Sequence, residues 1–443
     1  MFETIVALAT APMKSALSIV RLSGDDCFSI VSKFFSKNIE GETKNKILHG
    51  FIMDGEETVD EVVLLVYKNP RSFTGEDSVE IICHGSPLIY KRIVEVAIKN
   101  GARQATGGEF SSRSYFHGKL DLMQAESIND LINAETEESK RMSMYALKGE
   151  TSALVAPIKK ELGDILSLIE VNIDYPEYLD IEEANSDKIL AFCDDFERKI
   201  GILIDNGRKG NVIKDGINVA IVGKPNVGKS SILNAMLNEE KAIVTDVKGT
   251  TRDVVEGKMN LNGILLNLFD TAGIRESTDK VEEIGIKKSL DKLNESDIVL
   301  AVFDSSNFDE EDKEILKLVE GKNTIVVYNK KDLISDAEKQ ENVLYISAIN
   351  KDINVLKEAI YNKLNLKEEN FTTPSIANAR ELGILENVRS IMKQVKNDTL
   401  NGVPVDIVNS EIKEAYLKIL SLTGEDFDFD IAKEIFSRFC VGK

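Results

Sequence analysis

The stretch from Gly223 to Ser230 carries the pattern G-x-x-x-x-G-K-S. A run typical of a buried strand, residues 217–222, precedes it, and an apolar helical pattern follows it. Between a strand and a helix, the N–H groups of such a loop can surround phosphate oxygens. We expect Lys229 to reach the β- and γ-phosphates and the Ser230 hydroxyl to bind Mg²⁺. A simple glycine-rich turn is disfavoured, because the motif is complete and stands in the correct context.

Two further segments follow in the order that a nucleotide-hydrolysing domain requires. The first, Asp270-Thr271-Ala272-Gly273, ends a predicted strand. Asp270 is expected to support the Mg²⁺ through a water molecule, and the Gly273 N–H to contact the γ-phosphate. Lys248-Gly249-Thr250-Thr251-Arg252-Asp253 lies between the loop and this segment, and Thr251 is a candidate second hydroxyl ligand of Mg²⁺.

The segment Asn329-Lys330-Lys331-Asp332 indicates that the base is guanine. A carboxylate at Asp332 can accept both N–H groups of the guanine edge, and adenine offers no such pair. The Lys330 stem can cover the base, and Ser347-Ala348 can present a backbone N–H to the guanine oxygen. A polar turn without a ligand is the other interpretation, and the position after a strand favours GTP. The residues expected around the nucleotide are Gly223, Asn226, Val227, Gly228, Lys229, Ser230, Ser231, Thr245, Asp246, Val247, Lys248, Gly249, Thr250, Thr251, Asp270, Thr271, Ala272, Gly273, Asn329, Lys330, Asp332, Ser347 and Ala348.

The group that orients the attacking water must differ from the one used by Ras-like enzymes. In Ras-like enzymes a glutamine just beyond the D-x-x-G segment orients the water, but Ile274 stands there in this chain. Arg275 and Glu282 are the nearest polar candidates, and we prefer Glu282 acting through ordered water. The competing interpretation of Glu282 is a solvated helix residue. No arginine is obviously placed to act as a finger in cis.

The elements that must position these residues form several domains. From about 215 to 365, strand candidates alternate with amphipathic helices, which predicts a mostly parallel, doubly wound α/β sheet with one antiparallel edge hairpin at 261–264. The expected fold is therefore multidomain: an α+β N-terminal domain, an α-helical domain and an inserted α/β P-loop G domain. The boundaries are 1–118 for the N-terminal domain, 119–210 and 370–443 for the two parts of the helical domain, and 211–369 for the G domain.

The composition restricts location and partners. The chain of 443 residues has a formal charge of −20, which repels polyanions unless a local basic patch or a basic partner intervenes. No apolar run is long enough to span a bilayer, so we expect no membrane partner. We do not expect DNA as a partner either. The four cysteines are scattered without a C-x-x-C pair, which argues against zinc and a disulfide framework and favours a reducing cytoplasm.

These motifs together resemble the MnmE (TrmE) family of tRNA-modification GTPases. The G-domain motifs, including Asn226, Gly249–Asp253 and Asp270–Arg275, match those of the family. The similarity covers essentially the whole chain. Outside the G domain it rests on Ser72-Phe73-Thr74-Gly75-Glu76-Asp77, Val79-Glu80-Ile81 with His84-Gly85, Gly108-Glu109-Phe110, Gly118-Lys119-Leu120-Asp121 with Gln124-Ala125-Glu126, and the terminal Phe439-Cys440-Val441-Gly442-Lys443.

The resemblance implies a second ligand and a second metal. The N-terminal domain would dimerise and bind a formyl-tetrahydrofolate through Arg21, Glu80, Lys119 and Lys443. The other interpretation of Arg21 and Glu80 is that of strand residues facing solvent. Hydrolysis would depend on K⁺, which would replace the missing arginine finger. The implied K⁺ ligands are the Asn226 side chain and the backbone carbonyls of Thr245, Val247 and Thr250.

The resemblance also implies the overall reaction. An aminomethyl or carboxymethylaminomethyl group would be added at carbon five of the wobble uridine in certain tRNAs. The chain would act as a homodimer with an FAD-dependent partner, MnmG, in a heterotetramer, and that partner could carry much of the RNA affinity. Cys440 is a candidate catalytic residue, and a buried cysteine at a helix end is the equal alternative.

Two other functions share part of this pattern. A binding switch, such as a ribosome-assembly GTPase, would have every G-domain motif but not the N-terminal and terminal segments, and folate binding would separate it. A folate-dependent transferase in which GTP is only regulatory is the second. It would keep its activity when hydrolysis, but not GTP binding, is blocked.

Overall fold

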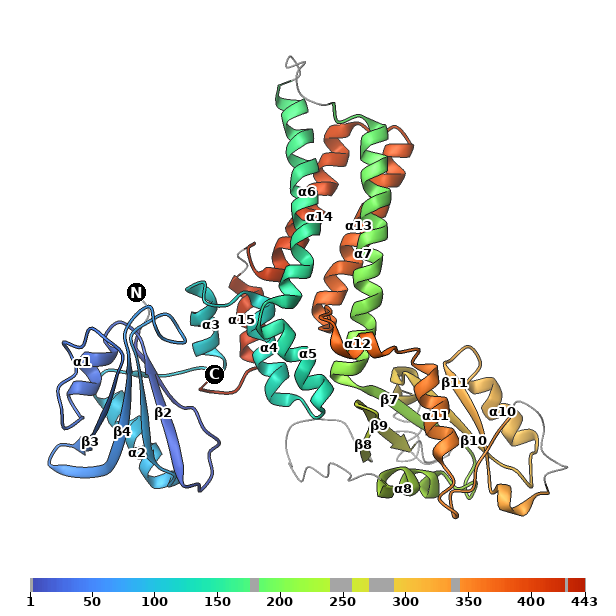
Figure 1. Cartoon of the computed structure of the whole chain (residues 1–443), viewed down its shortest axis with the longest axis horizontal. Coiled ribbons are helices and arrows are strands. Elements are labelled where there is room, and N and C mark those ends of the chain that lie inside the picture. The colour runs from blue at the N-terminus through green and yellow to red at the C-terminus, as the bar shows by residue number, and fades with distance from the viewer. Residues whose placement is uncertain are drawn as a thin grey trace, which may run out of the picture. The chain divides into compact units, whose positions relative to one another are not determined.

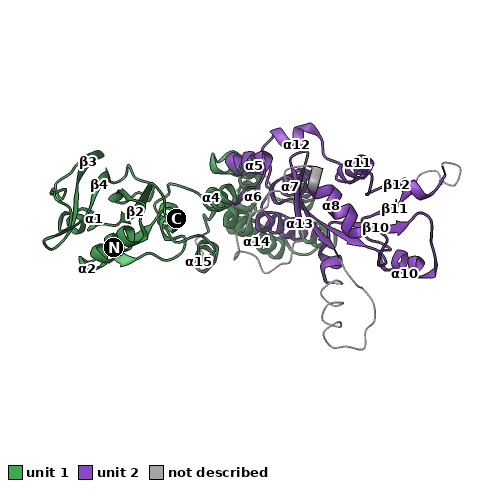
Figure 2. Ribbon diagram, turned by 90° about the horizontal axis from the view of Figure 1, so that it is seen from below, with its two compact units in different colours: residues 1–132, 146–190, 394–443 green, residues 133–145, 191–393 purple. Residues whose placement is uncertain are grey.

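A computed structural model describes residues 3–175, 183–239, 257–270, 291–335, 343–426 and 429–442. The chain divides into two compact units, which Figure 2 shows in different colours. Unit 1 contains residues 1–132, 146–190 and 394–443, and unit 2 contains residues 133–145 and 191–393. The first unit holds the N-terminal sheet and the second the G-domain sheet, so each can be described by itself (Figure 1).

The N-terminal domain is built on a mixed sheet with the strand order β3-β4-β5-β2-β1-β6 among the described residues. The pair β1–β6 is parallel, and the other pairs are antiparallel. Three helices accompany the sheet, which matches the predicted α+β class. The elements are β1 (Ile5–Leu8), β2 (Leu17–Ser23), α1 (Cys27–Ser32), β3 (Lys46–Asp54), β4 (Glu57–Tyr67), β5 (Ser78–His84), α2 (Pro87–Lys99), β6 (Arg103–Gln104) and α3 (Glu109–Phe116).

The two faces of this sheet differ in composition. Alternate residues of the strands, such as Val20, Leu64 and Ile81, are fully buried against α1 and α2. The opposite side chains form what we call the outer face. It comprises the apolar Leu17, Ile19, Ile47, Phe51, Val63, Leu65 and Ile82 together with the polar Arg21, His49, Glu61, Glu80 and His84, all of which are exposed or half-buried.

The remaining helices of unit 1 confirm the predicted helical domain. Ile158, Leu162 and Ile169 recur at helical spacing and are buried on α6, which packs on α14. Near the C-terminus, α15 packs Phe436 against the start of α4. The elements are α4 (Leu122–Asn133), α6 (Glu150–Asp174), α14 (Val405–Thr423) and α15 (Phe429–Ser437).

Unit 2 contains the G domain and long helices beside it. Ion pairs such as Arg389 to Glu197, at 2.7 Å, join α13 to α7. The elements outside the G-domain sheet are α5 (Glu137–Leu147), α7 (Ser186–Asp215), α12 (Glu368–Thr372) and α13 (Ala379–Leu400).

The G-domain sheet has the order β12-β11-β10-β7-β9-β8 within the described residues. Only the hairpin pair β8–β9 is antiparallel in this part of the chain, so the predicted parallel sheet with one edge hairpin is confirmed. Residues of α8 and α11 pack on one face and those of α10 on the other. The elements are β7 (Ile217–Val222), α8 (Lys229–Glu239), β8 (Gly257–Leu261), β9 (Ile264–Asp270), β10 (Ile298–Asp304), α10 (Glu310–Leu318), β11 (Thr324–Asn329), β12 (Leu344–Tyr345) and α11 (Asn354–Lys363).

Within the described part of the chain, every helix is too short or too polar to traverse a lipid bilayer.

Candidate functional site

The glycine-rich loop joins β7 to α8 at the carboxyl ends of the parallel strands. Strand order reverses at this point, because β10 lies on one side of β7 and β9 on the other. Gly228 has φ +97°, and a Cβ there would lie 2.2 Å from the Asn329 amide nitrogen. Glycine is therefore required both for the backbone conformation and for the close approach of Asn329. The loop is thus shaped to bring backbone N–H groups to the N-terminus of α8.

Lys229 lies across the mouth of this loop. Its ammonium donates hydrogen bonds to the carbonyl oxygens of Gly223, at 2.9 Å, and Lys224, at 3.0 Å. Burial lowers the pKa of Lys229, and the nearby Asp270 carboxylate opposes that shift. A positive charge held half-buried at a helix N-terminus is suited to a polyphosphate.

The oxygen ligands expected for Mg²⁺ meet beside the loop. The Ser230 hydroxyl lies 3.3 Å from one carboxylate oxygen of Asp270. The other oxygen, Oδ1, is buried and has no hydrogen-bond partner among the described residues. A buried carboxylate oxygen without a donor is costly unless a cation or water completes it, and oxygen ligands suit Mg²⁺. Ser230 and Asp270 therefore fit this ion, Asp270 through water.

A cavity of about 360 Å³ extends from the loop to the segment that should hold the base. The Asn329 amide connects both parts, since it donates to the Val227 carbonyl, at 2.9 Å, and accepts from the Ala348 N–H, at 3.1 Å. The Ser347 hydroxyl donates to the Asp332 carboxylate and orients it. The cavity is lined by Asn226, Gly228, Lys229, Ser230, Ser231, Asn329, Lys330, Asp332, Ser347 and Ile349.

Several supporting residues of this site were missed by the sequence analysis. Lys224 forms ion pairs of 2.7 Å with Asp309 and with the fully buried Asp312 at the start of α10. Lys330 pairs with Asp304 at 2.6 Å, which holds the lysine stem beside the base segment. These partners lie about 25 to 90 residues away in the sequence, so no local motif identifies them. For the partners of Lys224, the cluster of acidic residues at the start of α10 was the available sequence signal.

Some of the residues predicted at the two sites lie outside the described residues. They are Thr245, Asp246, Val247, Lys248, Gly249, Thr250, Thr251, Thr271, Ala272, Gly273, Arg275, Glu282 and Lys443.

A second cavity, of about 230 Å³, lies in the N-terminal domain. Arg21 on β2 and Glu80 on β5 are register partners and form an ion pair of 2.7 Å. The Arg21 guanidinium lies between the rings of Phe73 and Phe110, at 5.7 and 5.6 Å from their centroids. The cavity is lined by Arg21, Tyr67, Arg71, Ser72, Phe73, Thr74, Ser78 and Glu80. Arg21 and Glu80 are thus side by side and half-buried rather than facing bulk solvent.

Lys119 and the residue before Lys443 both have contacts close to this cavity. The Lys119 ammonium donates to the Pro70 carbonyl at 2.9 Å, just before the loop that lines the cavity. Lys443 is outside the described residues, but the carbonyl of the preceding Gly442 accepts a hydrogen bond from Arg21 at 3.4 Å. The C-terminal segment therefore reaches the same cavity as β2.

Cys440 is exposed and follows α15. The alternative of a buried cysteine at a helix end is therefore wrong. The chain is extended here and pairs with Gly107 through Val441, so that Phe439 turns into the core and Cys440 turns outward.

Comparison with known proteins places both cavities in matched regions. A family model described as the GTP-binding protein TrmE N-terminus matches residues 4–119, and one described as the MnmE helical domain matches residues 122–440. The chain belongs to the MnmE family. It is 42% identical over 450 residues to the tRNA modification GTPase MnmE of Mesoplasma florum, with 100% of this chain and 99% of that protein covered. The MnmE of Thermotoga maritima is 39% identical over 453 residues, with both chains covered completely.

Among solved structures, Aquifex aeolicus Era bound to GDP and AlF4⁻ aligns with 28% identity. The alignment covers 40% of this chain and 67% of that one, with a TM-score of 0.28.

Membership of the MnmE family makes this chain a GTP hydrolase that acts in tRNA modification. GTP is the nucleotide of such hydrolases, and Mg²⁺ is the metal that they use. The cavity beside Lys229 lies in the block matched by the second MnmE model, and the cavity beside Arg21 lies in the block matched by the first.

Proposed function

We propose that this chain acts with an FAD-dependent MnmG partner on carbon five of the wobble uridine in certain tRNAs, using the one-carbon unit of a formyl-tetrahydrofolate. The product carries an aminomethyl or carboxymethylaminomethyl group at that carbon. The observation that carries the proposal is the Arg21–Glu80 cavity, which a simple GTP-binding switch does not need. A GTP site and a second charged cavity in one chain indicate that hydrolysis serves a chemical step on another ligand.

The chemistry of a reduced folate suits this second cavity. Folates combine carboxylates, a pterin edge that both donates and accepts hydrogen bonds, and flat rings. Arg21 offers a guanidinium, Glu80 a carboxylate acceptor, and Phe73, only part-buried, a ring for stacking. A cavity with aromatic walls and a small number of polar groups is typical of a small-molecule site. Lys119 and Lys443 are proposed to complete the charge around the glutamate tail.

We propose that the N-terminal domains of two chains form a homodimer. The outer face carries large apolar side chains that a single chain leaves open to solvent: Ile47 is 73% exposed and Leu17 is 57% exposed. The cavity of about 230 Å³ is also smaller than the roughly 300–1,000 Å³ typical of ligand sites. A second copy over the outer face would cover these side chains and enlarge the site.

The roles in the GTP site follow from its geometry and from the family. Lys229 and the loop amides bind the phosphates, Ser230 and Thr251 ligate Mg²⁺, and Asp332 with Ala348 reads the guanine edge. Asn226, with the carbonyls of Thr245, Val247 and Thr250, binds K⁺, which supplies the positive charge of an absent arginine finger. Glu282, or failing it Arg275, orients the water.

The parts of the chain divide this work. Residues 1–118 bind folate and dimerise, and residues 211–369 bind GTP. The helices of residues 119–210 and 370–443 connect the two, and Cys440 is the candidate catalytic residue. Because the formal charge is −20, we assign much of the tRNA affinity to MnmG in a heterotetramer. The reaction takes place in the cytoplasm.

The test is a mass-spectrometric analysis of wobble nucleosides from cells that lack this gene. We expect the carbon-five modification to disappear and to return with the wild-type gene. An Arg21→Ala gene should not restore it, whereas Arg438→Ala, which removes an exposed ion pair on α15, should serve as a control and restore it. Unchanged nucleosides in the deletion strain would contradict the proposal.

A further inference from the structure

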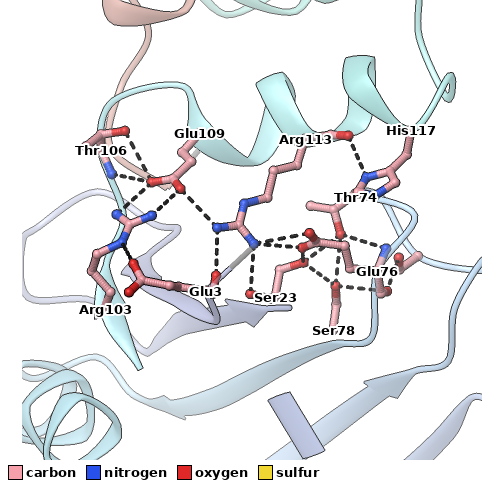
Figure 3. A network of polar contacts seen from close by, with 11 residues as sticks. Glu3, Ser23, Thr74, Glu76, Ser78, Arg103, Thr106, Glu109, Arg113 and His117 are labelled. Carbon is pink, nitrogen blue, oxygen red and sulfur yellow. Dashed lines mark hydrogen bonds and ion pairs between the residues drawn. The ribbon is translucent and has the colours of Figure 1, made fainter. Parts of the chain in front are cut away.

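A buried ion pair lies directly behind the second cavity. Arg113 on α3 is 2% exposed, and its Nη1 donates to both carboxylate oxygens of Glu76, at 3.1 and 3.0 Å; Glu76 is 5% exposed. Its Nη2 donates to the Glu3 carbonyl, at 2.7 Å, and to Glu109, at 3.0 Å. Figure 3 shows the guanidinium pointing between the two carboxylates. None of these residues lines the cavity or was assigned a role above.

Three hydroxyl groups extend this pair toward the cavity. Ser23 donates to Glu76 at 2.7 Å and shares hydrogen bonds with Thr74, at 2.6 Å, and Ser78, at 3.0 Å. Thr74 and Ser78 line the cavity, whereas Ser23 and Glu76 stand behind them. Figure 3 shows this chain of contacts running from α3 to the loop before β5. The hydroxyl groups of Thr74 and Ser78 are therefore linked to the carboxylate of Glu76 through Ser23.

The loop 71–76 forms one wall of the cavity and is fastened from the same helix. Ser72 donates to the backbone carbonyl of Glu76 at 2.5 Å, and Ser114, next to Arg113, donates to the Phe73 carbonyl at 2.8 Å. Phe73 in turn lies against the Arg21 guanidinium. Helix α3 thus sets the position of both the loop backbone and the ring that faces Arg21.

Stability alone does not explain a buried Arg–Glu pair at this place. Removing two charges from water is costly, and apolar residues of similar size often serve a fold equally well. The pair instead fixes the orientation of Glu76, because the N–H groups of the planar guanidinium donate in fixed directions. The orientation of Glu76 in turn fixes the loop 71–76, which forms one wall of the cavity. Small displacements of such a wall weaken ligand binding.

We propose that Arg113 is a positioning residue for the folate-type ligand: through Glu76 it holds loop 71–76 in the conformation that presents Phe73 and Thr74 to the cavity. This inference rests on the proposed folate function. It adds a residue that does not touch the ligand and acts through another side chain.

The experiment measures the affinity of the full-length protein for 5-formyltetrahydrofolate by calorimetry. The double variant Glu76→Gln with Arg113→Met removes both charges together and leaves no unpaired buried ion, so we expect it to fold with a melting temperature near that of wild type. Its affinity should be at least tenfold weaker. Arg113→Lys keeps the positive charge but lacks the planar guanidinium. Its affinity should lie between that of the wild type and that of the double variant.

The matched control is Arg103→Met. Arg103 belongs to the same ionic network, since it pairs with Glu109 at 2.6 Å and with Glu3 at 2.9 Å. Among the described residues, no hydrogen bond or ion pair joins it to loop 71–76. Its loss should leave the affinity within twofold of wild type. A double variant, or an Arg113→Lys variant, that binds as tightly as wild type overturns the inference, and so does an Arg103→Met variant that binds as weakly as the double variant. A wild-type protein that does not bind 5-formyltetrahydrofolate overturns the proposed function itself, and this inference with it.

Discussion

At the scale of single residues, recognition of the base and of the phosphates depends on different chemistry. In the proposed GTP site, Asp332 is held by the Ser347 hydroxyl at the end expected to take the base, whereas Lys229 and Ser230 lie at the end expected to take the phosphates. A carboxylate selects by matching two N–H groups, while a lysine attracts any polyphosphate. Changes at the two ends should therefore separate nucleotide preference from nucleotide affinity.

Asp332→Asn is expected to lower affinity for GTP relative to xanthosine triphosphate by at least about a hundredfold. The amide offers one acceptor and two donors, which mismatches the guanine edge and matches the xanthine carbonyl. Competition binding with both nucleotides measures the ratio. An unchanged preference would show that Asp332 does not read the base.

GTP turnover is expected to rise sharply when Na⁺ is replaced by K⁺, and Asn226→Ala should remove that difference. The reasons are the absence of a glutamine after Gly273 and of an obvious arginine finger, together with the family match at Asn226. Asn226 belongs to the glycine-rich loop, has φ 66° and lines the cavity. Steady-state rates in the two salts at equal ionic strength measure the effect, and equal rates in both salts for the wild type would contradict it.

At the scale of elements, helix α3 and the outer face of the N-terminal sheet determine what the domain can bind. The sheet buries one face against α1 and α2 and leaves side chains of the other, such as Ile47, exposed. Helix α3 depends on ion pairs, since Glu109 is bonded by both Arg103 and Arg113. Each feature can be tested by one substitution.

Ile47→Asp is expected to convert the dimer to monomers. Ile47 is 73% exposed on β3, so the change should not disturb the fold of one chain, but a carboxylate would be desolvated at the interface. Leu88→Asp is the control, because Leu88 is 83% exposed on α2, which covers the opposite face. Sedimentation equilibrium of the full-length variants gives the association state. If the Ile47→Asp variant forms dimers as stable as those of the wild type, the outer face is not the dimer interface.

Glu109 should make α3 stability depend on pH in the acid range. Burial raises the pKa of this carboxyl, but hydrogen bonds from Arg103, the Thr106 N–H and Arg113 outweigh it and hold the pKa at about 2. A lowered native pKa contributes stability that is complete above the unfolded value, near 4.5, and lost as pH falls toward 2. The contribution at neutral pH is roughly 2–3 kcal/mol.

Glu109→Gln should therefore lower the free energy of opening of α3 at pH 7, and the difference from wild type should shrink between about pH 4.5 and pH 2. Hydrogen exchange of the α3 peptides in urea, followed by mass spectrometry, measures it. A difference that stays constant across this range would assign the effect to packing rather than to charge.

At the scale of the whole molecule, the two cavities belong to different compact units of one chain. If GTP only regulated the folate chemistry, binding of the nucleotide would be sufficient. If hydrolysis drives the reaction, a variant that binds GTP but does not cleave it should be inactive in modification.

Glu282→Ala is the variant that distinguishes these cases. Positioning of the in-line water is most of what the protein contributes to phosphoryl transfer, so we expect near-normal GTP affinity and single-turnover hydrolysis slowed by at least about tenfold, or roughly 1.4 kcal/mol. Wobble modification in cells should fall with it. Stopped-flow binding, single-turnover rates and nucleoside analysis measure the three quantities. Unchanged hydrolysis would move attention to Arg275, and slow hydrolysis with full modification would support a regulatory role of GTP.

The sequence by itself determined the multidomain fold class, the parallel sheet with its edge hairpin, and the order of motifs around Lys229, Asp270 and Asp332. These features are local, because a buried strand, a glycine loop and a helix cap each need particular residue types at short fixed spacings. The positions of Arg21 and Glu80 came from family resemblance, since a charged residue on a strand has no spacing that marks it as a ligand contact.

Only the tertiary structure decided which distant residues meet. Arg21 donates a hydrogen bond to the carbonyl of Gly442, 421 residues away, and Arg113 donates to Glu76, 37 residues away. Lys224 meets a buried Asp312, and Cys440 turns outward because Phe439 fills the core. Such contacts depend on how strands and helices pack, and one-dimensional patterns of charge do not contain the distance between two elements. The ion pair behind the second cavity therefore became visible only once α3 lay against the loop before β5.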